Sequence, residues 1–147
     1  FYGDYFARKG KRSGAWAQGY RGHETFTGKT RTSITSNNNN FVKGPPGEPV
    51  LISLDDSRTL FHEFGHALHG LLSEVNYPGL ATTPRDFVEA PSQMLEEWVY
   101  DPKVLAPLQT VCPACKPVPD ELIAATLGVV LKHQSDQVKA SGELRLN

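Results

Sequence analysis

The stretch of sequence that decides the fold is residues 60–69, Leu-Phe-His-Glu-Phe-Gly-His-Ala-Leu-His. Its apolar residues recur at helical spacing, which predicts an α-helix over about 56–73. Residues four apart lie on one face of a helix, so His62 and His66 can offer two imidazole nitrogens to one metal ion. Glu63 lies beside them, where it can take a proton from a metal-activated water. The motif therefore predicts a metal-dependent hydrolytic site.

Length and composition exclude several other classes of protein. The chain has 147 residues, which fits a single domain over residues 1–147, and its formal net charge is -1. Such a balance gives no general reason to bind nucleic acid or an anionic membrane. No apolar run approaches the ~20 residues that a transmembrane helix needs. The chain begins without Met or a signal-peptide pattern, which favours a mature or excised product.

The segments around the motif predict a small sheet and a second helix. Two short runs, residues 30–35 and 49–53, carry the residues that favour strands, which places the strands within about 30–53. A helical pattern over about 84–100 contains Pro91, so we expect a kink or a fresh start near Ala90.

Helix ends and the last part of the chain give weaker signals. Ser53, Asp55 or Asp56 can cap the motif helix at its N-terminus. Apolar residues at helical spacing predict a further helix over about 121–133.

The first 40 residues hold two features with open interpretations. A basic cluster at residues 8–12 favours a solvated turn between packed aromatic segments, whose aromatic residues are Tyr2, Tyr5, Phe6, Trp16 and Tyr20. The four Asn at residues 37–40 fit either a polar loop or the edge of a strand that binds an extended peptide.

A catalytic zinc needs a third protein ligand besides the two His. His69 lies seven residues after His62, about 10 Å along the helix, so the two cannot reach one ion with His66 between them. The remaining candidates are the acidic residues downstream, which are Glu74, Asp86, Glu89, Glu96 and Glu97. Glu74 is too close in the chain to fold back, and spacing alone favours Glu89 over Glu96 only modestly.

Two motifs together resemble the thimet oligopeptidase family of zinc peptidases. They are His-Glu-Phe-Gly-His at residues 62–66 and Asp-Phe-Val-Glu-Ala-Pro-Ser-Gln-Met-Leu-Glu at residues 86–96. Segments at residues 11–16 and 41–44 are also similar to its peptidyl-dipeptidase (dipeptidyl carboxypeptidase) and oligopeptidase A branches. The resemblance covers about residues 1–123.

This resemblance implies a complete site. It places one Zn²⁺ per chain on His62, His66 and Glu89, makes Glu63 the general base, and gives Glu96 a supporting role behind the ligands. It also implies an α+β fold with a zincin-like core, mainly helical, with a small sheet packed on the motif helix. By the same analogy residues 32–41 would edge the substrate cleft.

The function that follows is hydrolysis of peptide bonds in short peptides by a metal-activated water. The alternative is a non-catalytic zinc-binding fragment or peptide-binding module. That alternative arises because the family's downstream His and Tyr residues, which steady the oxyanion, match no segment here, and because residues 124–147 diverge. Cys112 and Cys115 lie among prolines and fit incidental thiols. We expect a cytoplasmic location, with the periplasm as the alternative.

Overall fold

The structure is a computed structural model. It describes residues 1–48, 50–101, 103–104, 107 and 121. The chain divides into two compact units, Phe1–Val99 and Tyr100–Asn147. Cys112, Cys115, the divergent segment 124–147 and, apart from Glu121, the helix expected over 121–133 lie outside the described residues.

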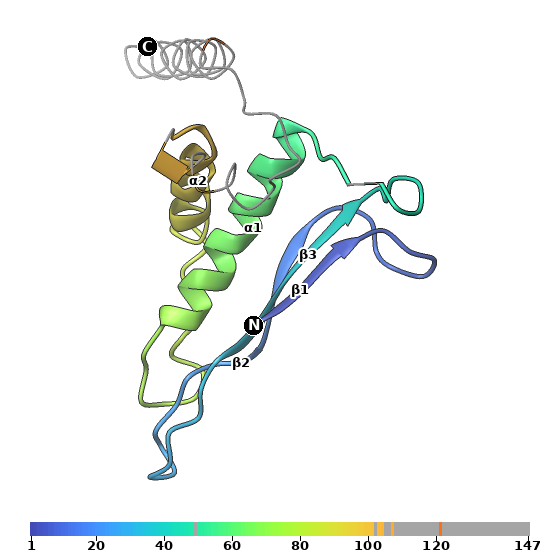
Figure 1. Cartoon of the computed structure of the whole chain (residues 1–147). Helices are drawn as coiled ribbons and strands as arrows, with labels where there is room; N and C mark the ends of the chain where they lie inside the picture. The colour runs from blue at the N-terminus through green and yellow to red at the C-terminus, as the bar shows by residue number, and fades with distance from the viewer. Residues whose placement is uncertain (49, 102, 105–106, 108–120, 122–147) are drawn as a thin grey trace, which may run out of the picture. The chain divides into compact units, whose positions relative to one another are not determined.

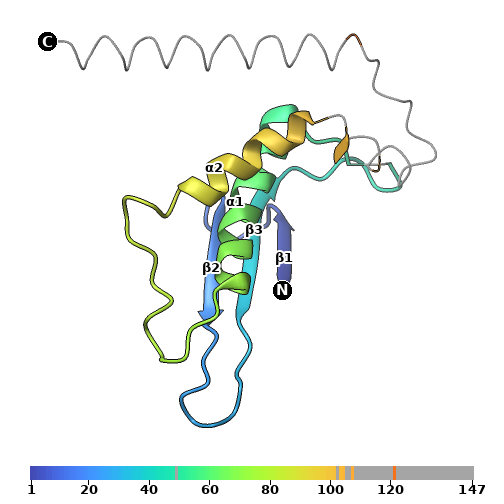
Figure 2. The ribbon, with the colours of Figure 1, turned by 90° about the vertical axis from the view of Figure 1, so that its left-hand side faces the viewer.

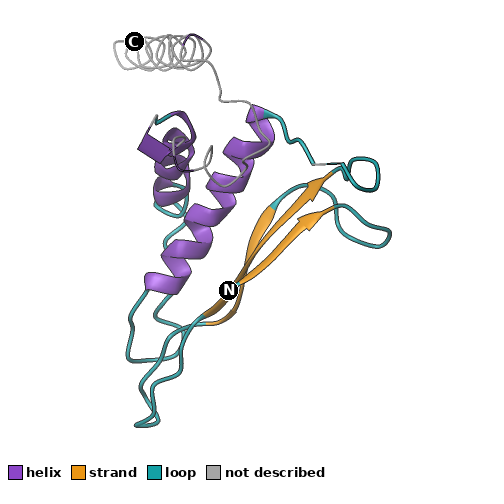
Figure 3. Ribbon diagram, viewed as in Figure 1, coloured by secondary structure: helices purple, strands orange, loops and turns teal. Residues whose placement is uncertain are grey.

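A three-stranded mixed sheet forms one layer of the first unit. Its strands are β1 (Tyr2–Phe6), β2 (Trp16–Arg21) and β3 (Ile34–Phe41), in the order β1-β3-β2. β1 runs parallel to β3 and β2 runs antiparallel to it. A small mixed sheet beside helices is compatible with the expected α+β class (Figure 3).

The Asn run is part of the central strand, so the interpretation of it as a strand edge that binds an extended peptide is wrong. Of residues 32–41, Thr35 lines the pocket beside the motif histidine His66. Asn37 and Asn39 are 1% and 0% exposed. Buried amides need partners, and the Asn37 side chain donates to the Leu60 carbonyl at 3.0 Å while Asn38 donates to the Trp16 carbonyl at 3.0 Å. The run thus ties the sheet to the motif helix and to β2.

The basic cluster of residues 8–12 is solvated except at Lys11, whose side chain is 3% exposed. Its ammonium donates to the carbonyls of Asp4 at 2.8 Å and Phe6 at 3.0 Å, and to that of Asn39. These carbonyls surround a register shift between β1 and β3, where strand pairing leaves backbone groups unmatched. The buried ammonium of Lys11 therefore supplies hydrogen bonds to backbone carbonyls at this irregular part of the sheet.

The neighbouring Asp4 carboxyl has a lowered pKa, and the hydrogen bond that it accepts from Arg8 is the main cause.

Two smaller expectations are also wrong. Tyr2 and Tyr20 do not pack but are 63% and 62% exposed. Residues 50–53 form no strand and instead lead into the motif helix.

The motif helix, α1 (Leu54–Leu72), begins at a capping box. The Ser53 hydroxyl accepts from the Asp56 amide at 3.0 Å, and the Asp56 carboxylate accepts from the Ser53 amide at 3.1 Å. These bonds satisfy amides that have no partner inside the helix. Within the first unit, α1 lies between the sheet and the second helix (Figures 1 and 2).

The second helix, α2 (Ala90–Glu96), is shorter than the expected 84–100 and is followed by a 3₁₀-helix, η1 (Glu97–Tyr100). The segment before it forms a turn, in which the Phe87 and Val88 amides donate to the Pro84 carbonyl. Pro91 stands in the first turn of α2, where the missing N–H is not needed. The fresh start near Ala90 is therefore what the structure shows.

In the described residues, no helix combines the length and apolarity needed to span a membrane.

Candidate metal centre

The two motif histidines present their nitrogens at one point of α1. The Nε2 atoms of His62 and His66 lie 3.2 Å apart, and the ring planes are inclined at 83°. The side chains are 24% and 19% exposed, so they sit at the floor of an accessible site.

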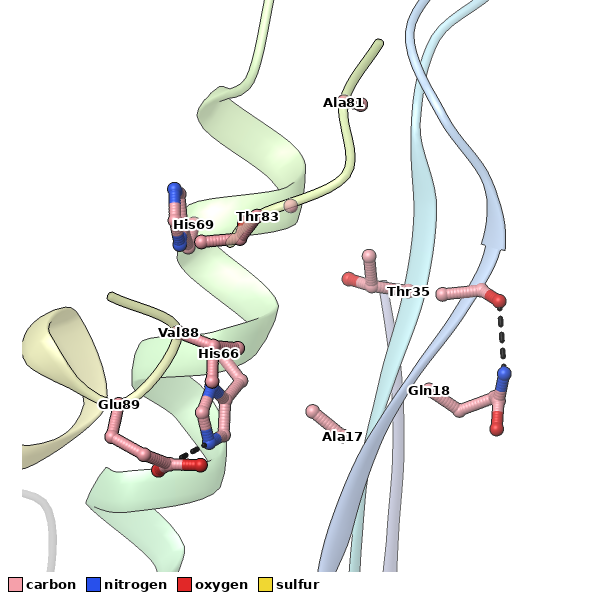
Figure 4. A pocket seen from close by; sticks show the side chains of 11 residues that line it. Ala17, Gln18, Thr35, His66, His69, Ala81, Thr83, Val88 and Glu89 are labelled. Carbon is pink, nitrogen blue, oxygen red and sulfur yellow. Dashed lines mark hydrogen bonds and ion pairs between the residues drawn. The ribbon is translucent and has the colours of Figure 1, made fainter. Parts of the chain in front are cut away.

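Glu89 completes the cluster from the other helix. It is the N-cap residue of α2, and its side chain makes no capping hydrogen bond. Its Oε2 atom lies 3.2 Å from Nε2 of His62 and 3.2 Å from Nε2 of His66. Figure 4 shows Glu89 reaching across to His66. Among the described residues, these three form the group of His, Cys, Asp and Glu side chains that could hold a metal ion.

The spacing of the three donor atoms fits a small tetrahedral ion. Bonds of about 2.0–2.1 Å at tetrahedral angles separate ligand atoms by about 3.3 Å, and all three separations here are 3.2 Å. Two imidazoles and a carboxylate are also one of the donor sets that catalytic zinc uses. The residues present therefore fit the ion that the sequence predicts.

Glu96 lies behind the cluster rather than in it. Its Oε1 is 2.6 Å from Nδ1 of His62, and its Oε2 accepts from Arg58 at 2.7 Å. Because an ionised carboxylate can only accept, Nδ1 of His62 carries the proton. In the neutral ring the lone pair is then on Nε2, the nitrogen that faces the other donors.

Arg58 joins this arrangement through Glu96, which the sequence did not predict. It precedes His62 by four residues, so the two share one face of α1 and meet the same carboxylate. The four-residue spacing of Arg58 and His62 is the sequence feature that could have predicted this contact.

Glu63, the predicted base, is 8% exposed and lies outside the donor cluster. Its carboxylate accepts no hydrogen bond from the described residues.

A pocket of about 370 Å³ lies between α1 and strand β2. Its walls come from β2, β3, α1 and the segment before α2; they are Ala17, Gln18, Gly19, Thr35, His66, His69, Gly70, Ala81, Thr83, Val88 and Glu89. Figure 4 shows Ala17 and Thr35 on the sheet side of this space and His66 and His69 on the helix side. His69 thus lines the pocket and is not one of the three donors.

Two His from α1 and a Glu at the N-cap of α2 form a candidate metal site of the His₂Glu class, on a small α+β scaffold. Comparison with known proteins gives the family: residues 1–130 match the model of peptidase family M3, and the chain belongs to that family. The predicted resemblance is confirmed.

Individual relatives are consistent with this family assignment. The chain is 46% identical over 124 residues to a dipeptidyl carboxypeptidase of Escherichia coli, which covers 83% of this chain and 18% of the relative. It is 36% identical over 127 residues to an oligopeptidase A of the same organism, covering 84% and 19%. A thimet-like oligopeptidase of Dictyostelium discoideum is 39% identical over 109 residues, covering 71% and 16%. The chain thus spans less than a fifth of the length of these relatives.

Proposed function

We propose that this chain is the zinc-dependent catalytic core of a peptidase that hydrolyses peptide bonds in short peptides. The observation that carries the proposal is the triangle of donor atoms from His62, His66 and Glu89, 3.2 Å on each side. The names of the relatives, which are peptidases, supply the substrate class. A zincin-like core, with a sheet against the motif helix, is part of the proposal and is supported by the contact of α1 with β3 and β2.

The chemistry divides between the ion and the chain. When bound, zinc would supply Lewis acidity, which polarises a carbonyl and brings the pKa of a water towards ~7. Glu63 would take the proton from the attacking water and pass it to the leaving amine. Its place next to His62 in the chain and its unpaired carboxylate support this role.

We place the substrate along β2 instead of β3. Within the described residues β2 is an edge strand, and Ala17, Gln18 and Gly19 of this strand line the pocket that contains His66 and Glu89. An edge strand offers unpaired backbone groups to an extended peptide.

Glu63→Gln is the variant that tests the mechanism. It removes the proton acceptor while keeping the shape of the side chain, so we expect cleavage of a short-peptide panel to fall by ~10²–10⁴-fold. Zinc content, measured by elemental analysis, should stay at one ion per chain. Glu74→Gln, an exposed position close to the end of α1, is the matched control and should cleave normally.

The outcomes separate the proposal from its alternative. Undiminished cleavage by zinc-loaded Glu63→Gln would exclude Glu63 as the base. A wild-type chain that binds one zinc but cleaves none of the peptides would identify a non-catalytic zinc-binding module.

A further inference from the structure

The ligand that α2 supplies is poorly sheltered. The Glu89 side chain is 52% exposed, whereas the two His ligands are 24% and 19% exposed. An exposed carboxylate on a flexible side chain has several accessible rotamers. A further contact that restricts this side chain to the rotamer that reaches the His pair would favour binding of the ion.

Ser92 provides that contact. It is 0% exposed, and its hydroxyl lies 2.9 Å from the carbonyl oxygen of Glu89 and 3.1 Å from the carboxylate Oε2. A hydroxyl has one proton to donate, and both acceptors belong to the same residue. A bond to the carbonyl oxygen holds only the backbone of Glu89, whereas a bond to Oε2 joins the carboxylate itself to a buried point of α2.

The position of Ser92 is set in turn by Gly65 in the middle of the motif. A Cβ atom at Gly65 would lie 2.5 Å from Cα of Ser92 and 3.0 Å from the carbonyl oxygen of Pro91. Both neighbours are backbone, which cannot turn aside as a side chain can. The absence of a side chain at Gly65 thus allows α2 to approach α1 at the level of the His pair.

We propose that Ser92, seated against Gly65, is the positioning residue for the third metal ligand. This inference rests on the proposed zinc site. Ser92 does not touch the ion; it restricts the Glu89 carboxylate to the place where its Oε2 is 3.2 Å from both His nitrogens. Groups that orient a ligand in this way typically change metal affinity by 10–100-fold.

The test is zinc affinity of the full chain, measured by competition with a chromophoric chelator. Ser92→Ala removes the hydroxyl but leaves Cα and the helix contact, so we expect zinc affinity to fall by about 10–100-fold. Thermal unfolding of the metal-free variant should change little. Ser57→Ala is the matched control, because the Ser57 hydroxyl also bonds a carbonyl of its own helix, that of Ser53 at 3.0 Å, away from the donors.

A double variant tests whether Ser92 affects zinc binding through Glu89. In Glu89→Ala the ligand is gone, so adding Ser92→Ala should cause no further loss of affinity. Ser92→Gly also lacks the hydroxyl and removes Cβ as well, so equal losses of zinc affinity in Ser92→Ala and Ser92→Gly would assign the effect to the hydroxyl.

The results distinguish this inference from the function on which it rests. A wild-type chain without zinc overturns the proposed site itself. A wild-type chain that binds zinc, with Ser92→Ala binding equally well, overturns only the role of Ser92. Equal losses with and without Glu89 would show that Ser92 acts on the fold in general and would also overturn it.

Discussion

The two oxygens of Glu96 serve two different residues, and this division gives a prediction for a single side chain. Oε1 orients His62 and Oε2 is held by Arg58. Glu96→Gln should lower zinc affinity by about 10–100-fold, because a neutral amide supports the imidazole less well and loses its charge partner. The measurement is chelator competition.

Glu97→Gln is the control for that variant, since Glu97 is adjacent and exposed. It should bind zinc as the wild type does. Equal affinity of Glu96→Gln and wild type would show that the contact of Glu96 with His62 does not support metal binding.

Single residues were predictable from the sequence where their relation lies within one helix. His62, Glu63 and His66 fall at fixed offsets, so their arrangement on α1 follows from helix geometry. Ser92 acts on a residue three positions earlier, yet the site needs Gly65 from the other helix. No pattern in one segment encodes a close approach between two segments.

At the scale of elements, the contact between α1 and α2 controls the site. Gly65→Ala would place Cβ 2.5 Å from a backbone atom of Ser92, so α2 would have to move away from α1. We expect the free energy of unfolding to drop by about 1–3 kcal/mol, as overpacking usually costs. Zinc affinity should fall as well, because Glu89 moves with α2.

Gly70→Ala is the control on the same helix. Its Cβ would meet only the Thr35 side chain, at 3.3 Å. Zinc affinity of this variant should match the wild type, measured alongside urea unfolding of both proteins. If Gly65→Ala retained full zinc affinity, the close approach would not govern the third ligand.

Elements were predicted well where their ends carry chemical signals and poorly where composition misleads. Ser53 and Pro91 mark helix starts through hydrogen bonding and ring geometry. The run over 37–40 has low strand propensity, yet it is central in the sheet. Its amides find partners on β2 and α1, and such tertiary partners override local preference.

At the scale of the whole molecule, the metal centre found in the described residues lies in the first compact unit. The donors His62, His66 and Glu89 all precede Val99, the last residue of that unit. A chain shortened to residues 1–101 should therefore fold and bind zinc with the affinity of the full chain. Loss of zinc binding in this shortened chain, with its circular dichroism unchanged, would show that the second unit contributes to the site.

The arrangement of the strands could not be predicted at this scale. β1 and β2 fall in the first 25 residues, where basic and aromatic residues hide any alternation. The central place of β3 depends on a parallel pairing with β1, and the connection between them contains β2 itself. Only the three-dimensional arrangement reveals that β2 is the edge strand of the described sheet that borders the pocket, beside Thr35 of the central strand β3.

The split of the ligands between two helices has a consequence for the chain as a polymer. An ion shared by His66 and Glu89 would act as a removable cross-link that closes a loop over residues 67–88 (88 − 66 = 22 residues). Covalent links that close loops of comparable size lower the entropy of the unfolded chain and raise the free energy of unfolding by about 3 kcal/mol. The ion of the proposed peptidase site would thereby also restrict the turn-rich segment between α1 and α2.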